Sequence, residues 1–176
     1  MEKAKAAAGS VAHFLLQPGV VAGLIPWWLT GWRVRQPLPS WAWAPLRLAG
    51  VGLIAAGVVA LVHAFVRFVE EGMGTPAPIA PTRYLVVGGL YRYVRNPMYL
   101  AVTAIIVGQA LVLGRPGLLL YAVAVAGAMA AFAHGYEEPV LHRQFGAQYE
   151  AYRRAVPPWW PRRHPWQPGQ VERGSN

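Results

Sequence analysis

The chain has 176 residues, of which 55% are hydrophobic and 13% are charged, so its charged fraction is about half the ~25% typical of soluble domains. The net charge of +9 resides on Lys and Arg residues that flank apolar segments, so we expect anionic lipids as partners and no nucleic acid. The absence of cysteine excludes disulfides, thiolate metal sites and a cysteine nucleophile. We therefore predict a single membrane domain over residues 1–176 with an all-α fold.

Four apolar segments predict transmembrane helices in a polytopic membrane protein. They cover residues 11–31, 46–69, 98–113 and 117–133, so that the N-terminal pair lies within residues 11–69. About 20 helical residues cross the ~30 Å core of a bilayer, a length that the first two segments reach. Gly114-Arg115-Pro116-Gly117 joins the shorter last two and predicts a tight transmembrane hairpin. Pro18 and Pro26 should kink the first segment.

The distribution of positive charge predicts the orientation of these helices. Four of the 16 Lys and Arg residues fall in loops on one side of the membrane, and the other twelve fall on the opposite side: the four are Arg33, Arg35, Arg47 and Arg115. Lys and Arg concentrate on the cytoplasmic side, so we expect both termini in the cytoplasm. Tryptophans flank the first outer loop, as in an interfacial aromatic belt: Trp27, Trp28, Trp32, Trp41 and Trp43.

Two polar islands interrupt the apolar sequence on the cytoplasmic side. The first island, residues 88–99, contains Arg92 and Arg95, which share a face if the turn is helical. Asn96 is expected to cap the next helix and Pro97 to occupy its first position, so that the helix dipole and Arg95 attract a carboxylate to this place. The alternative is that Arg92 and Arg95 only anchor the helix to lipid headgroups.

The second island, residues 134–139, supplies carboxylates. The chain has no aspartate, and four of its seven glutamates form the pairs Glu70-Glu71 and Glu137-Glu138. The second pair precedes Pro139, which is expected to start a helix. Such carboxylates are suited to ribose hydroxyls, an amine or a sulfonium, and the tyrosines of the islands are suited to stacking on a base or a cation. The five histidines do not cluster at metal-ligand spacing, so we expect no metal site.

The remaining segments frame these islands. Residues 72–81 are rich in Gly and Pro and are expected to form an ordered, non-helical crossing. Leu141, Phe145, Tyr149 and Tyr152 fall near one helical face, which predicts an amphipathic helix lying on the membrane or capping the site. Residues 156–161 contain three prolines and exclude regular helix. The tail, residues 167–176, is expected to be disordered.

Taken in order, these motifs resemble the isoprenylcysteine carboxyl methyltransferase family, and the related phospholipid methyltransferases share much of the pattern. The resemblance covers about residues 72–161 and rests on residues 88–99, Glu137-Glu138-Pro139, Phe145-Gly146, Tyr149, Tyr152, Val156-Pro157 and Pro161. Gly74-Thr75-Pro76-Ala77-Pro78 and Pro81 are similar to bacterial members, which implies a bacterial inner membrane. Many relatives have Arg-His-Pro where this chain has Arg95-Asn96-Pro97, and Gly-Pro-Tyr where it has Gly89-Leu90-Tyr91.

The resemblance implies an integral membrane enzyme that uses S-adenosylmethionine, with a cytosolic cofactor pocket in residues 72–161 and a lipophilic, prenylated substrate entering from the bilayer. It implies catalytic roles for Arg95 and Glu138. It places these residues at the cofactor: Tyr91, Arg95, Asn96, Pro97, Tyr99, His134, Glu137 and Glu138. Arg92, Arg95 and Arg154 are the residues expected at the substrate. Arg95 would orient an anionic acceptor beside the methyl donor.

Three functions remain open on the sequence. The favoured one is methyl transfer to the carboxylate of an isoprenylcysteine-like or isoprenoid acceptor, with a phospholipid amine as an alternative acceptor. The second is an NADPH-dependent reductase of a sterol or isoprenoid lipid, in which Arg153-Arg154 or Arg162-Arg163 would meet the 2′-phosphate. The third is a membrane protein that is not an enzyme and uses the islands as lipid anchors. Gly50, Gly52 and Gly57 allow close helix packing, within one chain or between copies.

Overall fold

The computed structural model describes residues 17–36, 38–72 and 84–167, and these residues form helices and connections without a β-strand. Most of the predicted crossing at 72–81, most of the tail at 167–176 and the start of the first apolar segment lie outside the described residues. The helices follow in the order η1 (Val20–Leu24), α2 (Ile25–Thr30), α3 (Ser40–Gly72), η2 (Gly89–Arg92), α4 (Pro97–Leu113), α5 (Gly117–Phe132), η3 (Ala133–Glu137), α6 (Glu138–Phe145) and α7 (Ala147–Ala155).

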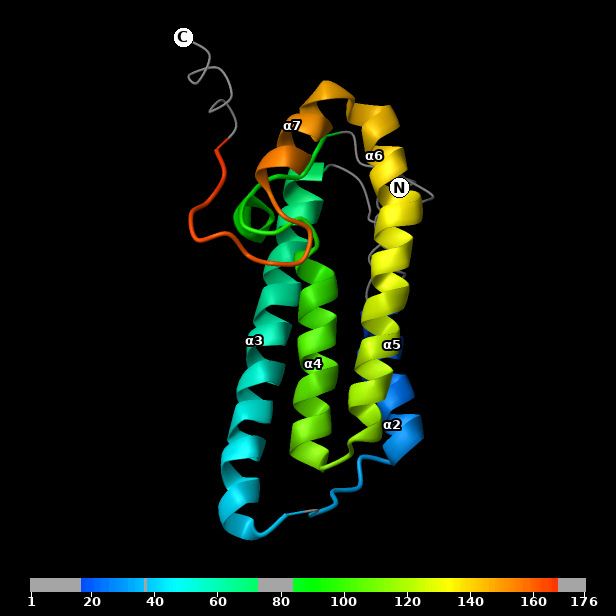
Figure 1. The fold of residues 1–176 in the computed structure, drawn as a ribbon, viewed down its shortest axis with the longest axis vertical. Helices are drawn as coiled ribbons and strands as arrows, with labels where there is room; N and C mark the ends of the chain where they lie inside the picture. The colour runs from blue at the N-terminus through cyan, green and yellow to red at the C-terminus, as the bar shows by residue number, and fades with distance from the viewer. Residues whose placement is uncertain (1–16, 37, 73–83, 168–176) are drawn as a thin grey trace, which may run out of the picture.

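Three long rods, α3, α4 and the continuous α5–η3–α6 helix, run along the long axis of the molecule (Figure 1). The described helices Ser40–Glu71 and Gly117–Phe145 are each long and apolar enough to cross a membrane, and Pro97–Leu113 is a shorter apolar helix between them. The predicted all-α membrane fold is therefore confirmed. The predicted hairpin is confirmed too, because Gly114 ends α4 in the left-handed conformation, with φ of 64°, and α5 starts three residues later.

Glycines bring α3 and α4 into close contact. A Cβ atom on Gly50 would lie 2.7 Å from the carbonyl oxygen of Gly108, and one on Gly108 would lie 2.6 Å from that of Gly50. Seven residues further along the same face of α3, a Cβ on Gly57 would meet Ala101 of α4 at 2.9 Å. Gly52 has no such neighbour among the described residues. The packing of Gly50 and Gly57 is therefore satisfied within one chain.

Pro26 explains how the first helical segment is fastened to the bundle. Proline has no N–H, so the carbonyl of Ala22, four residues earlier, lacks its normal helical partner. The side chain of Gln109 on α4 donates to this oxygen at 2.5 Å, and the hydroxyl of Tyr121 on α5 donates to the neighbouring carbonyl of Val21 at 2.8 Å. The π-helix η1 thus docks through carbonyls that its own backbone leaves free.

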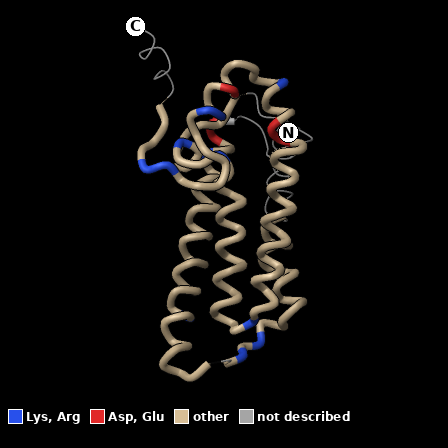
Figure 2. Tube along the Cα trace, viewed as in Figure 1, with Lys and Arg blue, Asp and Glu red and all other residues tan. Residues whose placement is uncertain are grey.

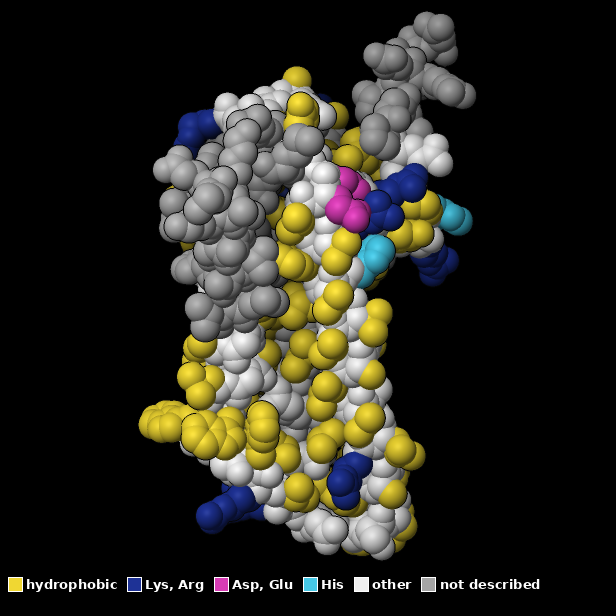
Figure 3. Space-filling model, turned by 180° about the vertical axis from the view of Figure 1, so that it is seen from behind, with side chains coloured by type: hydrophobic (Ala, Val, Ile, Leu, Met, Phe, Trp, Pro, Cys, Tyr) yellow, Lys and Arg dark blue, Asp and Glu magenta, His cyan; other side chains and the backbone are white. Residues whose placement is uncertain are grey.

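The lateral surface is apolar and the charges lie at the two ends. Figure 3 shows hydrophobic side chains along the sides of the rods, and Figure 2 shows Lys and Arg at both ends but Asp and Glu at one. Large apolar side chains are exposed on α3 and α5, among them Leu48, Val59, Leu120 and Val123. Such a surface is suited to lipid tails and not to water. We call the end with the glutamates the acidic end.

At the acidic end the C-terminal segment folds back over residues 84–95 (Figure 1). Gly146, with φ of 51°, separates α6 from α7, so the predicted amphipathic helix is two helices at an angle. Its apolar face packs inward, in a buried cluster of Tyr149, Tyr152, Val156 and Trp166 against Leu85 and Val87. The amphipathic segment was predicted either to lie on the membrane surface or to cap the islands, and in the structure its apolar face covers the segment that contains the first island. Residues 156–161 contain no helix, as predicted.

Candidate functional site

The first polar island is held in place by the C-terminal segment through main-chain hydrogen bonds. The N–H of Arg95 donates to the carbonyl of Pro157 at 3.0 Å, and the N–H of Arg162 donates to that of Tyr93 at 3.0 Å. The N–H of Trp166 donates to the carbonyl of Arg92 at 2.9 Å. These bonds fix the backbone just before α4 and leave the Arg95 side chain directed at the second island.

Arg95 and Glu138 form the centre of the site. The Nη1 of Arg95 donates to Oε1 of Glu138 at 2.7 Å and to the hydroxyl of Tyr149 at 3.1 Å. The two charged side chains are only 11% and 15% exposed. A charge-assisted hydrogen bond between two largely buried groups holds the guanidinium in one orientation. Removing either partner would leave the other charge buried without compensation.

The second oxygen of Glu138 faces two further basic groups. Nδ1 of His134, one helical turn earlier, lies 3.4 Å from Oε2 of Glu138, and Nη1 of Arg153 on α7 lies 3.7 Å from it. The side chain of His134 is 86% exposed and that of Arg153 is 46% exposed. The largely buried carboxylate of Glu138 therefore joins Arg95, which precedes α4, to the α5–η3–α6 helix and to α7.

Tyr149 is almost completely buried, and its hydroxyl stays protonated at neutral pH. Burial raises the pKa of Tyr149, and the Glu138 carboxylate raises it further, while Arg95 opposes the increase. The hydroxyl accepts from Arg95, so its own proton remains available for a second partner. The neutral hydroxyl of Tyr149 thus restricts the orientation of the Arg95 guanidinium without neutralising its charge.

A second carboxylate lies beside this centre. The hydroxyl of Tyr99 on α4 donates to Oε1 of Glu137 at 2.6 Å, which ties α4 to the π-helix η3. The ring of Tyr99 stacks on that of Trp159, with centroids 6.4 Å apart. Both glutamates of the pair predicted from the sequence therefore face residues of the first island.

An apolar groove of about 560 Å³ begins at Tyr99 and runs between the rods, away from the acidic end. We call it the lateral groove. It is lined chiefly by apolar side chains of η1, α3, α4 and α5: Val21, Leu61, Met98, Val102, Ala128, Met129 and Phe132. The volume and the apolar lining of the groove are suited to a hydrocarbon chain whose polar end rests near Tyr99.

Two buried side-chain nitrogens at the acidic end have no hydrogen-bond partner among the residues that the structure describes. They are Nε of Arg95, at the centre of the site, and Nη1 of Arg162, on the C-terminal segment that holds the first island. A buried N–H without an acceptor is costly, so each one indicates a place where an acceptor from outside the protein fits. Both donors belong to guanidinium groups, so the acceptor that fits best is an anion such as a carboxylate.

The structure brings together most of the residues predicted to act at the cofactor, but some only support the site. Tyr91 is buried against Ala64 and Val86, and its carbonyl accepts from the hydroxyl of Tyr152 at 2.7 Å. Pro97 is buried at the start of α4, as predicted. Asn96 precedes it, but its side chain does not cap the helix: the amide donates to the carbonyl of Pro158 at 3.3 Å.

Two residues predicted at the substrate lie apart from this centre. Arg92 does not share the surroundings of Arg95, because its Nε donates to the carbonyl of Trp166 at 2.7 Å. Arg154 is 77% exposed and pairs with Glu150 at 3.0 Å, one turn earlier on α7. The geometry assigns Arg92 to holding the C-terminal segment and Arg154 to the surface.

Tyr149, Arg153 and Trp159 contact the site but were not among the predicted site residues. Tyr149 was expected only on the apolar face of an amphipathic helix, and Arg153 only as a partner of a nicotinamide phosphate. The one sequence signal for Tyr149 is a hydroxyl on an otherwise apolar face, since a buried tyrosine hydroxyl normally finds a partner. Nothing in the local sequence of Trp159 indicates Tyr99 as its neighbour.

A family model described as phospholipid methyltransferase matches residues 46–148. The matched segment starts in α3 and includes Arg95, Tyr99, Glu137 and Glu138, and it ends just before Tyr149. No match to a curated protein or to a solved structure was found.

Proposed function

Because the chain belongs to the phospholipid methyltransferase family, we propose that it is an integral membrane enzyme that transfers a methyl group from S-adenosylmethionine to a lipophilic acceptor. The observation that carries this proposal is the pairing of Arg95 with Glu138 next to the Tyr99–Glu137 pair, at the end of the lateral groove where Tyr99 lies. In this proposal residues 72–161 hold the cofactor and residues 11–69 help to shape the lipid-facing side.

The donors and acceptors of the site suit this cofactor. S-adenosylmethionine, when bound, supplies an electrophilic methyl group on a sulfonium. The carboxylates of Glu137 and Glu138 are suited to its cationic groups and ribose hydroxyls, and the exposed His134 can donate to it. Tyr99 and Trp159 offer aromatic faces. The Nε–H of Arg95, which has no partner in the described part of the chain, is suited to an anionic group beside the methyl donor.

Arg95 is the residue that we expect to orient the acceptor. Glu138 already takes one of its donors and offsets part of its charge, so the guanidinium can hold an acceptor carboxylate without neutralising it fully. A carboxylate is ionised at neutral pH and needs no general base. Catalysis then consists mainly of positioning the acceptor beside the methyl donor in a site that excludes most water. The low exposure of Arg95 and Glu138 supports this.

The lateral groove supports an acceptor with a hydrocarbon chain. Its lining is apolar and it ends at Tyr99, so an isoprenylcysteine-like or isoprenoid acid would lie with its chain along α4 and α5 and its carboxylate toward Arg95. The description of the matching family favours a second candidate acceptor, the amine of a phospholipid. An amine must lose a proton, and Glu137 is a carboxylate in direct contact with Tyr99 of the groove lining.

One assay separates these acceptors. The purified protein in detergent is incubated with S-adenosylmethionine labelled in the methyl group and with either an N-acylated farnesylcysteine or phosphatidylethanolamine. A methyl ester releases labelled methanol in alkali, whereas an N-methyl group does not. We expect alkali-labile label on the prenylated acid. Alkali-stable label on the phospholipid would move the acceptor to the amine.

A binding measurement tests the enzyme class itself. Calorimetric titration is made with S-adenosylhomocysteine and, separately, with NADPH. We expect saturable binding of S-adenosylhomocysteine alone. Binding of NADPH alone would replace the methyltransferase by a reductase and make the four arginines at 153–154 and 162–163 the next residues to change.

A further inference from the structure

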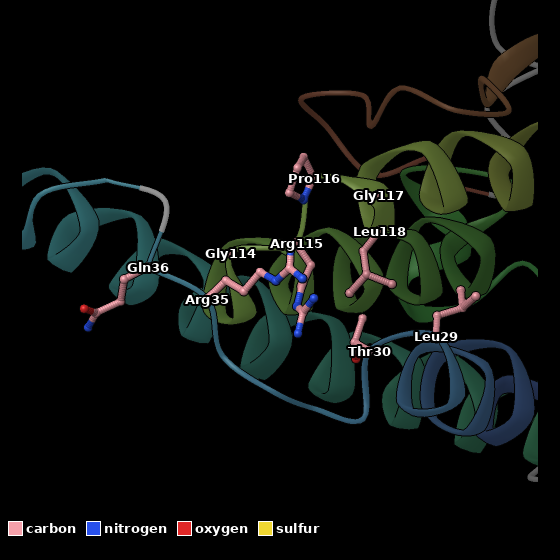
Figure 4. Close-up of a pocket in the computed structure, with 9 residues that line it drawn as sticks. All are labelled: Leu29, Thr30, Arg35, Gln36, Gly114, Arg115, Pro116, Gly117 and Leu118. Atoms are coloured by element: carbon pink, nitrogen blue, oxygen red, sulfur yellow. The ribbon is translucent and has the colours of Figure 1, made fainter.

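The end of the molecule opposite the acidic end contains a pocket of about 800 Å³. Two connections that are distant in sequence form it: the segment after α2 and the turn between α4 and α5 (Figure 4). The N–H of Arg35 donates to the carbonyl of Leu113 at 2.8 Å, and Nε of Arg115 donates to the carbonyl of Arg33 at 3.0 Å. These bonds hold the two connections together, so the pocket is a built feature and not a gap between loose loops.

The lining combines two arginines with an apolar wall. Figure 4 shows the side chain of Arg35 extending toward that of Arg115, with Leu118 and Thr30 to one side of them and Leu29 beyond. Leu118 is buried and Leu29 is half exposed at the edge of the lateral surface. A ligand for this pocket is therefore anionic on one side and apolar on the other.

The arginines of this pocket have no carboxylate partner in the part of the chain that the structure describes. All the described ion pairs involve the glutamates of the acidic end. Figure 2 shows the acidic residues of the described chain at that end and not beside this pocket. Two guanidinium groups that face one pocket repel each other, and an anion between them removes the repulsion. The charge of the pocket therefore favours occupation by an anion from outside the chain.

The position of the pocket indicates where that anion comes from. It lies at the ends of the apolar rods, where Trp27, Trp28 and Trp32 are exposed. Exposed tryptophans mark the depth of lipid headgroups in membrane proteins. At this depth the abundant anion with an apolar body is a phospholipid.

We propose that this pocket binds the phosphate of an anionic phospholipid, with Arg35 and Arg115 contacting the phosphate and Leu29 and Leu118 contacting the start of an acyl chain. The site is separate from the methyl-transfer site, which lies at the other end of α4 and α5, and it does not depend on the identity of the methyl acceptor. It also gives a reason for arginines on the side of the membrane where positive charge is otherwise sparse.

The test measures lipid binding to the full-length protein in detergent by native mass spectrometry, with phosphatidylglycerol and with the neutral phosphatidylcholine. Arg35→Gln removes a guanidinium whose side chain makes no described hydrogen bond. Arg47→Gln, which removes a positive charge from the same side but outside the pocket, is the control. We expect Arg35→Gln to weaken phosphatidylglycerol binding about tenfold, the loss of one charged hydrogen bond, and Arg47→Gln to leave it unchanged.

Four results would overturn the proposal. They are unchanged binding in Arg35→Gln, an equal loss in Arg47→Gln, equal binding of phosphatidylcholine, and complete displacement of phosphatidylglycerol by millimolar inorganic phosphate, which would make the site one for free phosphate. Thermal unfolding of each variant is followed in parallel. If Arg35→Gln does not fold, Arg35→Lys tests the same point, because it keeps the charge but not the planar fork and should still weaken binding.

Discussion

Arg95 is the residue on which most of the proposed chemistry depends. Its guanidinium links Glu138 and Tyr149, and its buried Nε–H has no partner among the described residues. We expect Arg95→Ala to lower methyl transfer by about 10²-fold, because a misplaced acceptor loses the benefit of alignment. Turnover, binding of S-adenosylhomocysteine and thermal unfolding are measured on the same detergent-purified sample.

The matched control for this change is Arg154→Ala. Arg154 is exposed and pairs only with Glu150 among the described residues, so its loss should leave turnover within about twofold. Wild-type turnover in folded Arg95→Ala would remove Arg95 from the reaction. Equal losses in the two variants would point to a general effect of charge.

Glu138 is expected to act through its charge and not only through its shape. Glu138→Gln keeps an acceptor for Arg95 but removes the negative charge, so we expect the Kd for S-adenosylhomocysteine to rise about tenfold, the worth of one charge-assisted bond. Glu70→Gln changes an exposed carboxylate on α3 that pairs with Arg67 and serves as the control. An unchanged Kd in Glu138→Gln would exclude this carboxylate from the cofactor site.

The sequence predicted which residues lie at the helix ends but not which of them meet. Arg95 and Glu138 were both expected at the acidic end, because proline and the ends of apolar segments locate them. Their contact at 2.7 Å depends on how α4 and α5 are rotated in the bundle, which local pattern does not encode. The same holds for Arg92, which has the same chemistry as Arg95 but is turned toward Trp166.

At the scale of helices, the contact between α3 and α4 can be tested with a pair of glycines. Gly50→Ala places a methyl group 2.7 Å from the carbonyl oxygen of Gly108, whereas Gly52→Ala, on the same helix, meets nothing within 4 Å. Both changes gain the same helix propensity, so the difference between them isolates packing. We expect Gly50→Ala to be less stable than Gly52→Ala by about 1–3 kcal/mol. Denaturant unfolding in detergent measures the difference in the free energy of unfolding between the two variants. Equal values would show that α3 and α4 accommodate the extra methyl group at Gly50 without loss of stability.

The lateral groove offers a second test on α5. Ala128 lines the groove, so Ala128→Trp should obstruct it and raise the KM for a lipophilic acceptor, while binding of S-adenosylhomocysteine stays unchanged. Ala124 is exposed one turn earlier on α5 and does not line the groove, so Ala124→Trp controls for a large side chain in the lipid-facing surface. A normal KM in Ala128→Trp would place the acceptor elsewhere.

The sequence predicted the helices well where proline and glycine mark their ends. Pro97, Gly114 and Gly117 gave the bounds of α4 and the start of α5 correctly. The continuation of α5 through η3 into α6 was not predicted, because Glu137-Glu138-Pro139 was expected to close one helix and open another. The π-helix η3 lies directly before Pro139, which has no N–H, and the helix continues past the proline without a break. The sequence of a single chain carries no signal for a π-helix.

For the whole molecule, the distribution of charge predicts one orientation in the membrane. Glutamates lie at one end. Arg33, Arg35 and Arg115 lie in the connections at the other end, and Arg47 lies in the first turns of α3, so we expect the acidic end in the cytoplasm with the cofactor. Reporter fusions after Arg115 and at the C-terminus check this. We expect the first outside and the second inside, and the reverse result would place the site away from cytosolic S-adenosylmethionine.

The hydrogen bonds that fix the first island also set an order of events during biosynthesis. Arg95 emerges from the ribosome well before Pro157, Arg162 and Trp166, whose backbone holds the island in place. The rods α3, α4 and α5 have therefore all been made while the arginine still lacks its anchor. Insertion into the bilayer and completion of the site are separate stages, and a chain interrupted between them would have its membrane helices but no formed site.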